Sequence, residues 1–224
     1  MDALLRRRAM IAAGGSPTPP PTPTPVFYDY LVFDGTASIE ITGLSIPDDF
    51  TIGVYLGHET NKAAQRLFWL PGSPVSFGAI LNSSTNSSNR CFSIYYGASG
   101  AASTNKTLAF STKGYSFFLT PKRFGWNSTS YTFTKGTASP TGTLMIGKNA
   151  TTGNPYSGDM MRFRIYGSDA QNVTDATDLL NNYTPIYTFK PCTYNGEAGM
   201  WCVETSTFHG NTAGEGTLSV RNSE

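Results

Sequence analysis

Hydrophobic and polar residues alternate with a period of two along most of the chain after residue 25. Such alternation predicts β-strands that bury one face and expose the other. Turns rich in Gly and Pro separate the alternating segments, and many short strands with frequent turns predict an all-β sandwich or barrel. The clearest segments are 38–42, 50–56, 92–96, 131–134 and 161–166. In the last of them, the pattern places Met161, Phe163 and Ile165 on the buried face.

One segment departs from this pattern. Residues 172–183 place apolar side chains three and four positions apart, as on one face of an α-helix. We expect Asn172 or Thr174 to cap this helix and Pro185 to end it. The apolar face of the predicted helix consists of Val173, Ala176, Leu179, Leu180 and Tyr183.

Composition divides the chain into three parts. Residues 16–25 read Ser-Pro-Thr-Pro-Pro-Pro-Thr-Pro-Thr-Pro, and such frequent proline favours polyproline II, which has no internal hydrogen bonds. The stretch from Pro17 to Pro25, at about 3.1 Å per residue, forms a semi-rigid spacer of about 28 Å. Residues 26–224 carry the strand pattern and are expected to form one domain.

Residues 1–15 combine apolar side chains with a run of arginines. The segment is either a frayed terminus or an anchor that becomes ordered on a partner surface, where its arginines meet carboxylates. In the second interpretation, the residues that hold the partner are Leu4, Leu5, Arg6, Arg7, Arg8, Met10 and Ile11.

The charge content is low. Only 14% of the residues are charged and 13% are aromatic, which excludes a coiled coil and a highly charged disordered tail. The formal net charge of +1 gives no overall attraction to nucleic acid, and no apolar run reaches the roughly 18 residues of a membrane span. The apolar stretch 9–13 is too short for a secretory signal peptide. We therefore expect no export, no membrane and no nucleic-acid partner.

The chain has three cysteines, so at least one thiol is unpaired. Cys192 and Cys202 could pair across a hairpin. A protein that is not exported keeps its thiols reduced, and unpaired cysteines are among the most buried residues. We favour three reduced, mostly buried thiols.

The sequence contains no recognisable catalytic pattern. His58 and His209 lack the spacing of a zinc site, and there is no Gly-x-Ser-x-Gly elbow or phosphate-binding loop. A glycosidase needs two carboxylates that converge across a cleft, and the chain has no Glu-x-Asp or Glu-x-Glu. Asp48 and Asp49 fit a turn better than a calcium site, which needs roughly six to eight oxygens. We expect a protein that is not an enzyme and has no cofactor or resident metal.

Aromatic rings that pack against the apolar face of a sugar are the remaining candidates for a site. Trp126 precedes the polar turn 127–130, so its ring is expected at the rim of a loop. The alternative place for each such ring is the core of the sandwich. The candidate glycan contacts are Trp126, Tyr96 and Tyr156.

Four segments resemble one family. The segments 30–39 and 50–53 resemble the first strands of concanavalin A-like lectin/glucanase domains in their laminin-G-like form. The segments 144–147 and 156–166 are similar to that family's closing pair, in which a strand ending in Gly precedes one ending in Tyr or Trp. The resemblance covers residues 26 to about 170. It implies a jelly roll of two antiparallel sheets, and the acidic motif of the family's hydrolases is missing from this sequence.

The order of the three parts is similar to that in virion-associated proteins of tailed phages of gut bacteria, such as head fibres and capsid decoration proteins. The resemblance implies a virion surface protein, assembled in the host cytoplasm, whose residues 1–15 dock on capsid or other virion proteins. Its domain would hold weakly to host or mucus glycans through many copies. We expect a homo-oligomer, with a trimer as the hypothesis. The alternatives are a receptor-binding tail-fibre module and an exported bacterial surface lectin.

Overall fold

The computed structural model describes residues 23–59, 65–73, 76–83, 89–97, 102–109, 114–132, 139–148 and 154–223. Within these ranges, the side chains of residues 58–59, 80–83, 89–97, 102–109 and 154 are not described. The predicted anchor 1–15 and most of the predicted spacer 16–25 lie outside the described residues.

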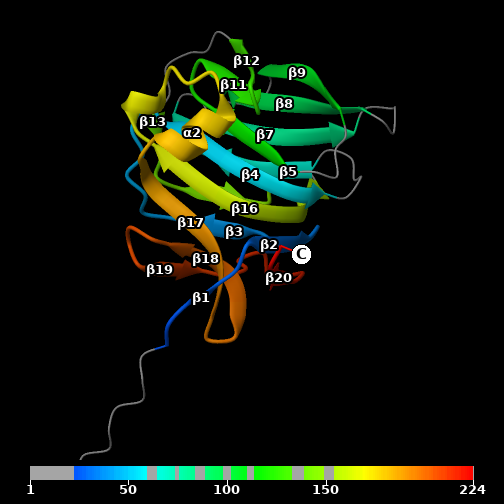
Figure 1. Ribbon diagram of the computed structural model, residues 1–224, viewed down its shortest axis with the longest axis vertical. Coiled ribbons are helices and arrows are strands. Elements are labelled where there is room, and N and C mark those ends of the chain that lie inside the picture. The colour runs from blue at the N-terminus through cyan, green and yellow to red at the C-terminus, as the bar shows by residue number, and fades with distance from the viewer. Residues whose placement is uncertain are drawn as a thin grey trace, which may run out of the picture.

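Two sheets stack face to face and form a sandwich (Figure 1). The large sheet has the order β12 (Thr129–Thr132), β11 (Arg123–Trp126), β10 (Tyr115–Leu119), β4 (Thr51–Glu59), β16 (Ser157–Tyr166), β17 (Pro185–Tyr194), β18 (Glu197–Cys202) and β19 (Thr207–His209). Three further strands extend it, with β1 (Val26–Phe27) on β17, β2 (Tyr30–Asp34) on β16 and β20 (Leu218–Arg221) on β2.

The small sheet has the order β3 (Ile39–Ile41), β14 (Leu144–Ile146), β5 (Gln65–Leu70), β7 (Ser76–Ser83), β8 (Asn89–Gly97) and β9 (Ala102–Ala109). The strand β15 (Asn154–Pro155) joins β5 in parallel, whereas the other pairs of this sheet are antiparallel. A short separate pair is formed by β6 (Gly72–Ser73) and β13 (Ser139–Pro140).

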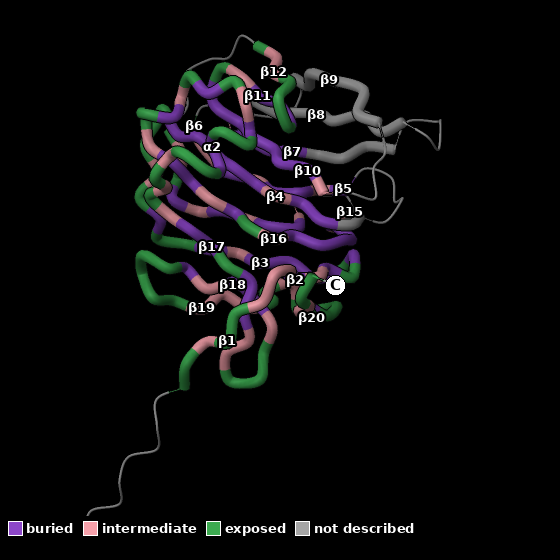
Figure 2. Tube along the Cα trace, viewed as in Figure 1, coloured by how far each residue is buried: buried purple, intermediate pink, exposed green. Residues whose placement is uncertain are grey.

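The hydrophobic core lies between the two sheets and draws on both of them (Figure 2). In β4, Ile52 and Val54 are fully buried and belong to this core. The ring of Phe68 on β5 meets the ring of Phe163 on β16 edge to face, with 5.5 Å between the ring centroids. The core faces predicted for 38–42 and 50–56 are confirmed, and so is the all-β sandwich of two antiparallel sheets. The opposite faces are not exposed throughout as expected, because Ser38 and Thr51 are fully buried.

The predicted helix exists but begins later than expected. The helix α2 (Ala176–Asn182) follows a short 3-10 turn, η1 (Ser168–Ala170). Asp175 caps α2, because its carboxylate accepts hydrogen bonds from the amides of Thr177 (2.7 Å) and Asp178 (3.0 Å). The expectation that Asn172 or Thr174 caps the helix is therefore wrong. No helix in the described part of the chain is long and apolar enough to cross a membrane.

The helix α2 covers part of the outer face of the large sheet (Figure 1). A second apolar cluster fills the space between them, and it consists of Phe118, Tyr166, Ala170, Val173, Ala176 and Leu179. Gly53 of β4 permits this close approach, because a Cβ there would lie 3.0 Å from the ring of Tyr166 and 3.2 Å from Leu179. On the outer face of β16, Tyr166 therefore lies beneath the helix, whereas Arg162 is exposed to solvent.

A break in the register of β16 changes which methionine faces the core. The pairing with β4 shifts between Met160 and Arg162, so that Met161 is an extra residue on this strand. Such a bulge redirects the side chains around it. Met160 is fully buried and Met161 is half-buried on the outer face. The prediction that Met161 faces the core is therefore wrong, whereas Phe163 and Ile165 are in the core as predicted.

Two of the three cysteines have described side chains, and both are free and buried. Cys192 on β17 lies opposite Gly199, and Cys202 on β18 lies opposite Phe189. The two thiols are therefore at different positions along the β17–β18 hairpin. For these two residues, the prediction of buried thiols is confirmed, and they are not paired with each other. The side chain of Cys91 lies outside the described set.

Candidate functional site

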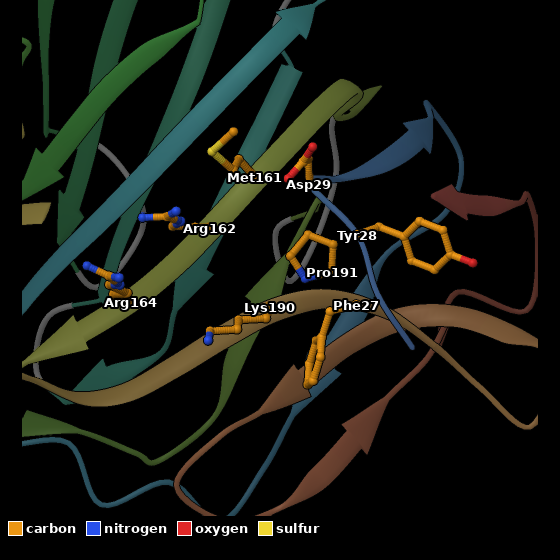
Figure 3. Close-up of a pocket in the computed structure, with 8 residues that line it drawn as sticks. All are labelled: Phe27, Tyr28, Asp29, Met161, Arg162, Arg164, Lys190 and Pro191. Carbon is orange, nitrogen blue, oxygen red and sulfur yellow. The ribbon is translucent and has the colours of Figure 1, made fainter. Parts of the chain in front are cut away.

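A pocket of about 250 Å³ opens on the outer face of the large sheet (Figure 3). It lies between β16 and β17, next to the segment that leads from β1, paired with β17, to β2, paired with β16. We call it the basic pocket. Its lining residues are Phe27, Tyr28, Asp29, Met161, Arg162, Arg164, Lys190 and Pro191.

The strand pattern explains why cations gather here. Phe163 and Phe189 lie opposite each other in β16 and β17, and both point into the core. Their neighbours along each strand must then point outwards. Arg162 and Arg164 therefore project from β16, and Lys190 projects on the same side from β17 (Figure 3).

A second pocket, of about 200 Å³, continues from the first towards α2. The two pockets share Met161 and Arg162, and the second is also lined by Tyr55 of β4 and by Leu180 and Asn181 of α2. Together they form a groove along β16, which we call the basic groove. The bulge at Met161 therefore lies in the floor of this groove.

The basic pocket has an excess of positive charge. Asp29 is its one carboxylate, against Arg162, Arg164 and Lys190. The hydroxyl and amide of Ser223 donate hydrogen bonds to Asp29 at 2.5 and 2.8 Å. These bonds lower the pKa of Asp29 below its ordinary value, and the nearby Arg162 lowers it further. Asp29 is therefore ionised at neutral pH, and its hydrogen bonds go to the C-terminal segment.

The cations have few partners within the protein. Among the described residues, Arg162 and Lys190 form no ion pair. Arg164 donates a hydrogen bond from Nη1 to the carbonyl oxygen of Leu180 at the end of α2. The Nε of Arg164 is buried and has no hydrogen-bond partner among the described groups.

An exposed aromatic ring borders the pocket. Phe27 is 50% exposed, and Nζ of Lys190 lies 5.8 Å from the centroid of its ring. The amide of Tyr28 donates to the carbonyl oxygen of Pro191 at 3.0 Å, which holds this segment on β17. A charged floor beside an apolar rim is an arrangement typical of small-ligand sites.

The aromatic residues predicted to contact glycans lie elsewhere. Tyr156 is fully buried, and its hydroxyl donates to the carbonyl oxygen of Asp159 at 3.1 Å. Trp126 is only 9% exposed and packs against Tyr131, with 5.3 Å between the two ring centroids. Both predictions are wrong, because these two rings complete the core between the sheets. Tyr96 lies in β8, and its side chain is outside the described set.

The acidic and histidine residues considered as metal ligands do not form a metal site among the described residues. Asp48 and Asp49 are exposed in a turn. His209 lies near the ring of Phe189, and burial lowers the pKa of its imidazole. In the part of the chain that is described, no three His, Cys, Asp or Glu side chains are grouped to hold a metal ion.

The sequence contained a partial signal for the basic pocket. The alternation of Arg162 and Arg164 with apolar residues indicates two cations on one outward face. The contribution of Lys190 and Phe27 depends on the pairing of β17 with β16 and β1, which local pattern does not reveal.

Solved structures with a similar fold come from different sources. The heptameric SAP-like pentraxin of Limulus polyphemus matches over 80% of this chain and 96% of its own, with 11% identity and a TM-score of 0.51. Domains LG4–5 of the mouse laminin alpha1 chain match over 62% and 41%, with 12% identity and a TM-score of 0.46. The enzymatically active domain of tailspike protein 2 of bacteriophage CBA120 matches over 74% and 33%, with 12% identity and a TM-score of 0.43.

No protein-family profile and no curated protein sequence matches this chain. At 11% identity, the pentraxin match concerns the fold alone. With the sheet order described above, it confirms the predicted concanavalin A-like jelly roll.

Proposed function

We propose that this protein is a non-enzymatic, carbohydrate-binding jelly-roll module that a phage particle displays on its surface. The observation that carries the binding part of the proposal is the basic pocket. It is an open hollow on the part of the sheet that α2 leaves uncovered, and it combines hydrogen-bond donors with the exposed ring of Phe27. Sugars offer hydroxyl groups and an apolar ring face, which match these two features.

The lining of the groove supports a role in binding rather than in hydrolysis. Glycoside hydrolysis requires two carboxyl groups on either side of the scissile bond. The basic pocket contains Asp29 alone, and the second pocket is lined by no acidic residue. Asp29 is engaged by Ser223 and is ionised, so it is a poor general acid.

The sequence of residues 1–25 supports display on a particle. In this proposal, residues 1–15 anchor the chain on capsid or other virion proteins, and residues 16–25 act as the spacer. The spacer ends at β1, whose residues Val26 and Phe27 pair with Thr193 and Cys192 of β17. The domain is therefore attached to the spacer through a strand of its own sheet. A homo-trimer and a head-fibre position belong to the same proposal, with avidity from many copies compensating for weak single contacts.

The binding part is tested on the full-length protein with a panel of immobilised host and mucus polysaccharides. We expect retention on at least one of them, without any release of reducing sugar. Phe27→Ala should weaken retention, whereas Val203→Ala, which removes another exposed apolar side chain, should not. A protein that binds no polysaccharide of the panel would refute this part of the proposal.

The display part is tested on purified particles. We expect cryo-electron microscopy to show residues 1–15 in a repeating shell with the sandwich outside it. Replacing Arg6, Arg7 and Arg8 with Glu should release the protein from particles, whereas Lys122→Glu in the domain should not. If the triple variant still associates with particles, the hypothesis that residues 1–15 anchor the protein is wrong.

A further inference from the structure

We propose that the basic groove selects acidic saccharides, in which a carboxylate or sulfate group is held between Arg162 and Lys190. This inference rests on the proposed carbohydrate-binding function and names its ligand class. It goes beyond that function because a lectin-like jelly roll can also bind neutral sugars.

The direction of the side chains is the first argument. Arg162, Arg164 and Lys190 come from two neighbouring strands and extend to the same side of the sheet (Figure 3). Three cations and the single carboxylate of Asp29 face this hollow and leave it with a net positive charge, which an anionic ligand would offset.

The lack of an internal counterion is the second argument. The one carboxylate of the basic pocket, Asp29, is directed to Ser223 by two hydrogen bonds. Arg221 pairs with Asp159, whereas Arg162 and Lys190 have no ion-pair partner among the described residues. An anionic ligand would supply the missing charge.

The hold on Arg164 is the third argument. Its Nη1 donates to the carbonyl oxygen of Leu180, so the end of α2 sets the position of the guanidinium group. A cation that is already fixed loses little side-chain entropy when a ligand binds.

The apolar rim favours a sugar over a simple inorganic anion. Phe27 is half exposed at one side of the pocket, and Met161 lies in the floor shared with the second pocket. A free phosphate or sulfate ion would leave this apolar surface in water. An acidic sugar covers it with the carbon face of its ring while its charged group meets the cations.

The test uses the full-length protein and pairs of saccharides that differ in charge alone. Calorimetry compares oligogalacturonate with its methyl ester, and heparin oligosaccharide with a form that is desulfated, N-acetylated and carboxyl-reduced and therefore uncharged. We expect binding of at least one acidic member, with affinity about tenfold or more above its uncharged counterpart. This affinity should fall as the salt concentration rises.

Two double variants locate the effect. Arg162→Gln with Lys190→Gln should reduce binding of the acidic saccharide about tenfold or more. Lys122→Gln with Lys148→Gln removes the same charge elsewhere and should leave binding nearly unchanged. Arg164 is left intact because its bond to Leu180 supports α2. Thermal unfolding curves that match the wild type will show that both variants are folded.

The outcomes separate this inference from the proposed function. Equal binding of charged and uncharged saccharides overturns the inference and leaves the carbohydrate-binding function intact. Binding of neither member of either pair, and of nothing on the polysaccharide panel, overturns both. Polyglutamate that binds as tightly as the acidic saccharides also overturns the inference, because it would indicate an acidic peptide as the natural ligand.

Discussion

Asp34 shows how one carboxylate connects two distant segments. It ends β2 and accepts hydrogen bonds from the amides of Thr36 (2.8 Å) and Ala37 (2.9 Å) and from the amide of Thr217, just before β20. Partial burial of the carboxyl group raises its pKa, but the three amides outweigh that effect and bring the pKa to about 2. The charged form of Asp34 therefore stabilises the junction between β2 and β20.

Asp34→Asn should lower the free energy of unfolding at pH 7 by about 1 kcal/mol, less than for a buried charged group because Asp34 is exposed to solvent. The folded-state pKa of about 2 lies below the ordinary 3.8, so the stabilisation is complete above about pH 4 and is lost as the pH falls towards 2. Urea unfolding at neutral and acid pH measures it. If the two proteins differ by the same amount at every pH, the charge of Asp34 is not the cause.

The thiols of Cys192 on β17 and Cys202 on β18 are protected because both residues are fully buried. Burial raises the pKa of Cys192 to about 11, and the thiolate is the reactive form. In a Cys91→Ser variant, a thiol reagent at about pH 8 should label neither cysteine in the folded protein and both in urea. Rapid labelling of the folded variant would contradict the buried environment of these residues.

At the scale of an element, the cap of α2 supports one wall of the basic groove. Asp175 holds the first turn, and Leu180 and Asn181 at the other end line the second pocket. The amide of Ala176 also donates to the carbonyl oxygen of Asn127 at 2.7 Å, which ties the helix to the turn after β11. The helix is short, so its stability depends on these contacts.

Asp175→Ala should cost about 0.5–2 kcal/mol of unfolding free energy, because two amides of the first turn lose their acceptor. Thr174→Ala is the matched control, because Thr174 is exposed and takes no part in the hydrogen bonds that cap α2. Urea denaturation followed by circular dichroism measures both. An equal loss in both variants would mean that Asp175 does not act as the cap.

At the scale of the whole molecule, one core cluster contains residues from β2 to β20, near both ends of the described chain. The three tryptophans lie on β5, β11 and β18, and therefore report on both sheets. Because the two sheets bury a common core, we expect them to unfold together. Residues 26–224 would then behave as the one domain that the sequence predicts.

This expectation is tested by following urea unfolding with tryptophan fluorescence and with far-ultraviolet circular dichroism. The two transitions should have the same midpoint and the same slope. A fluorescence transition that precedes the loss of strand signal would indicate that the small sheet or the β17–β18 hairpin unfolds separately.

Local spacing was sufficient to predict the class of the fold. Apolar residues at every second position, such as those around Ile52 and Phe163, indicate the buried face of a strand. This spacing can be read directly from the sequence. The same reasoning correctly predicted a helix around Leu179. The residue that caps α2 was predicted wrongly, because several residues before the helix have suitable side chains and only one of them lies at its start.

The basic pocket and the aromatic core depend on contacts between segments far apart in the chain. Lys190 and Phe27 approach β16 because β17 pairs with both β16 and β1, and the bulge at Met161 follows from pairing with β4. Trp126 and Tyr156 have local patterns that suit a loop rim or a core equally well. They are buried because the opposite sheet lies over them, a long-range contact that a periodic pattern does not encode.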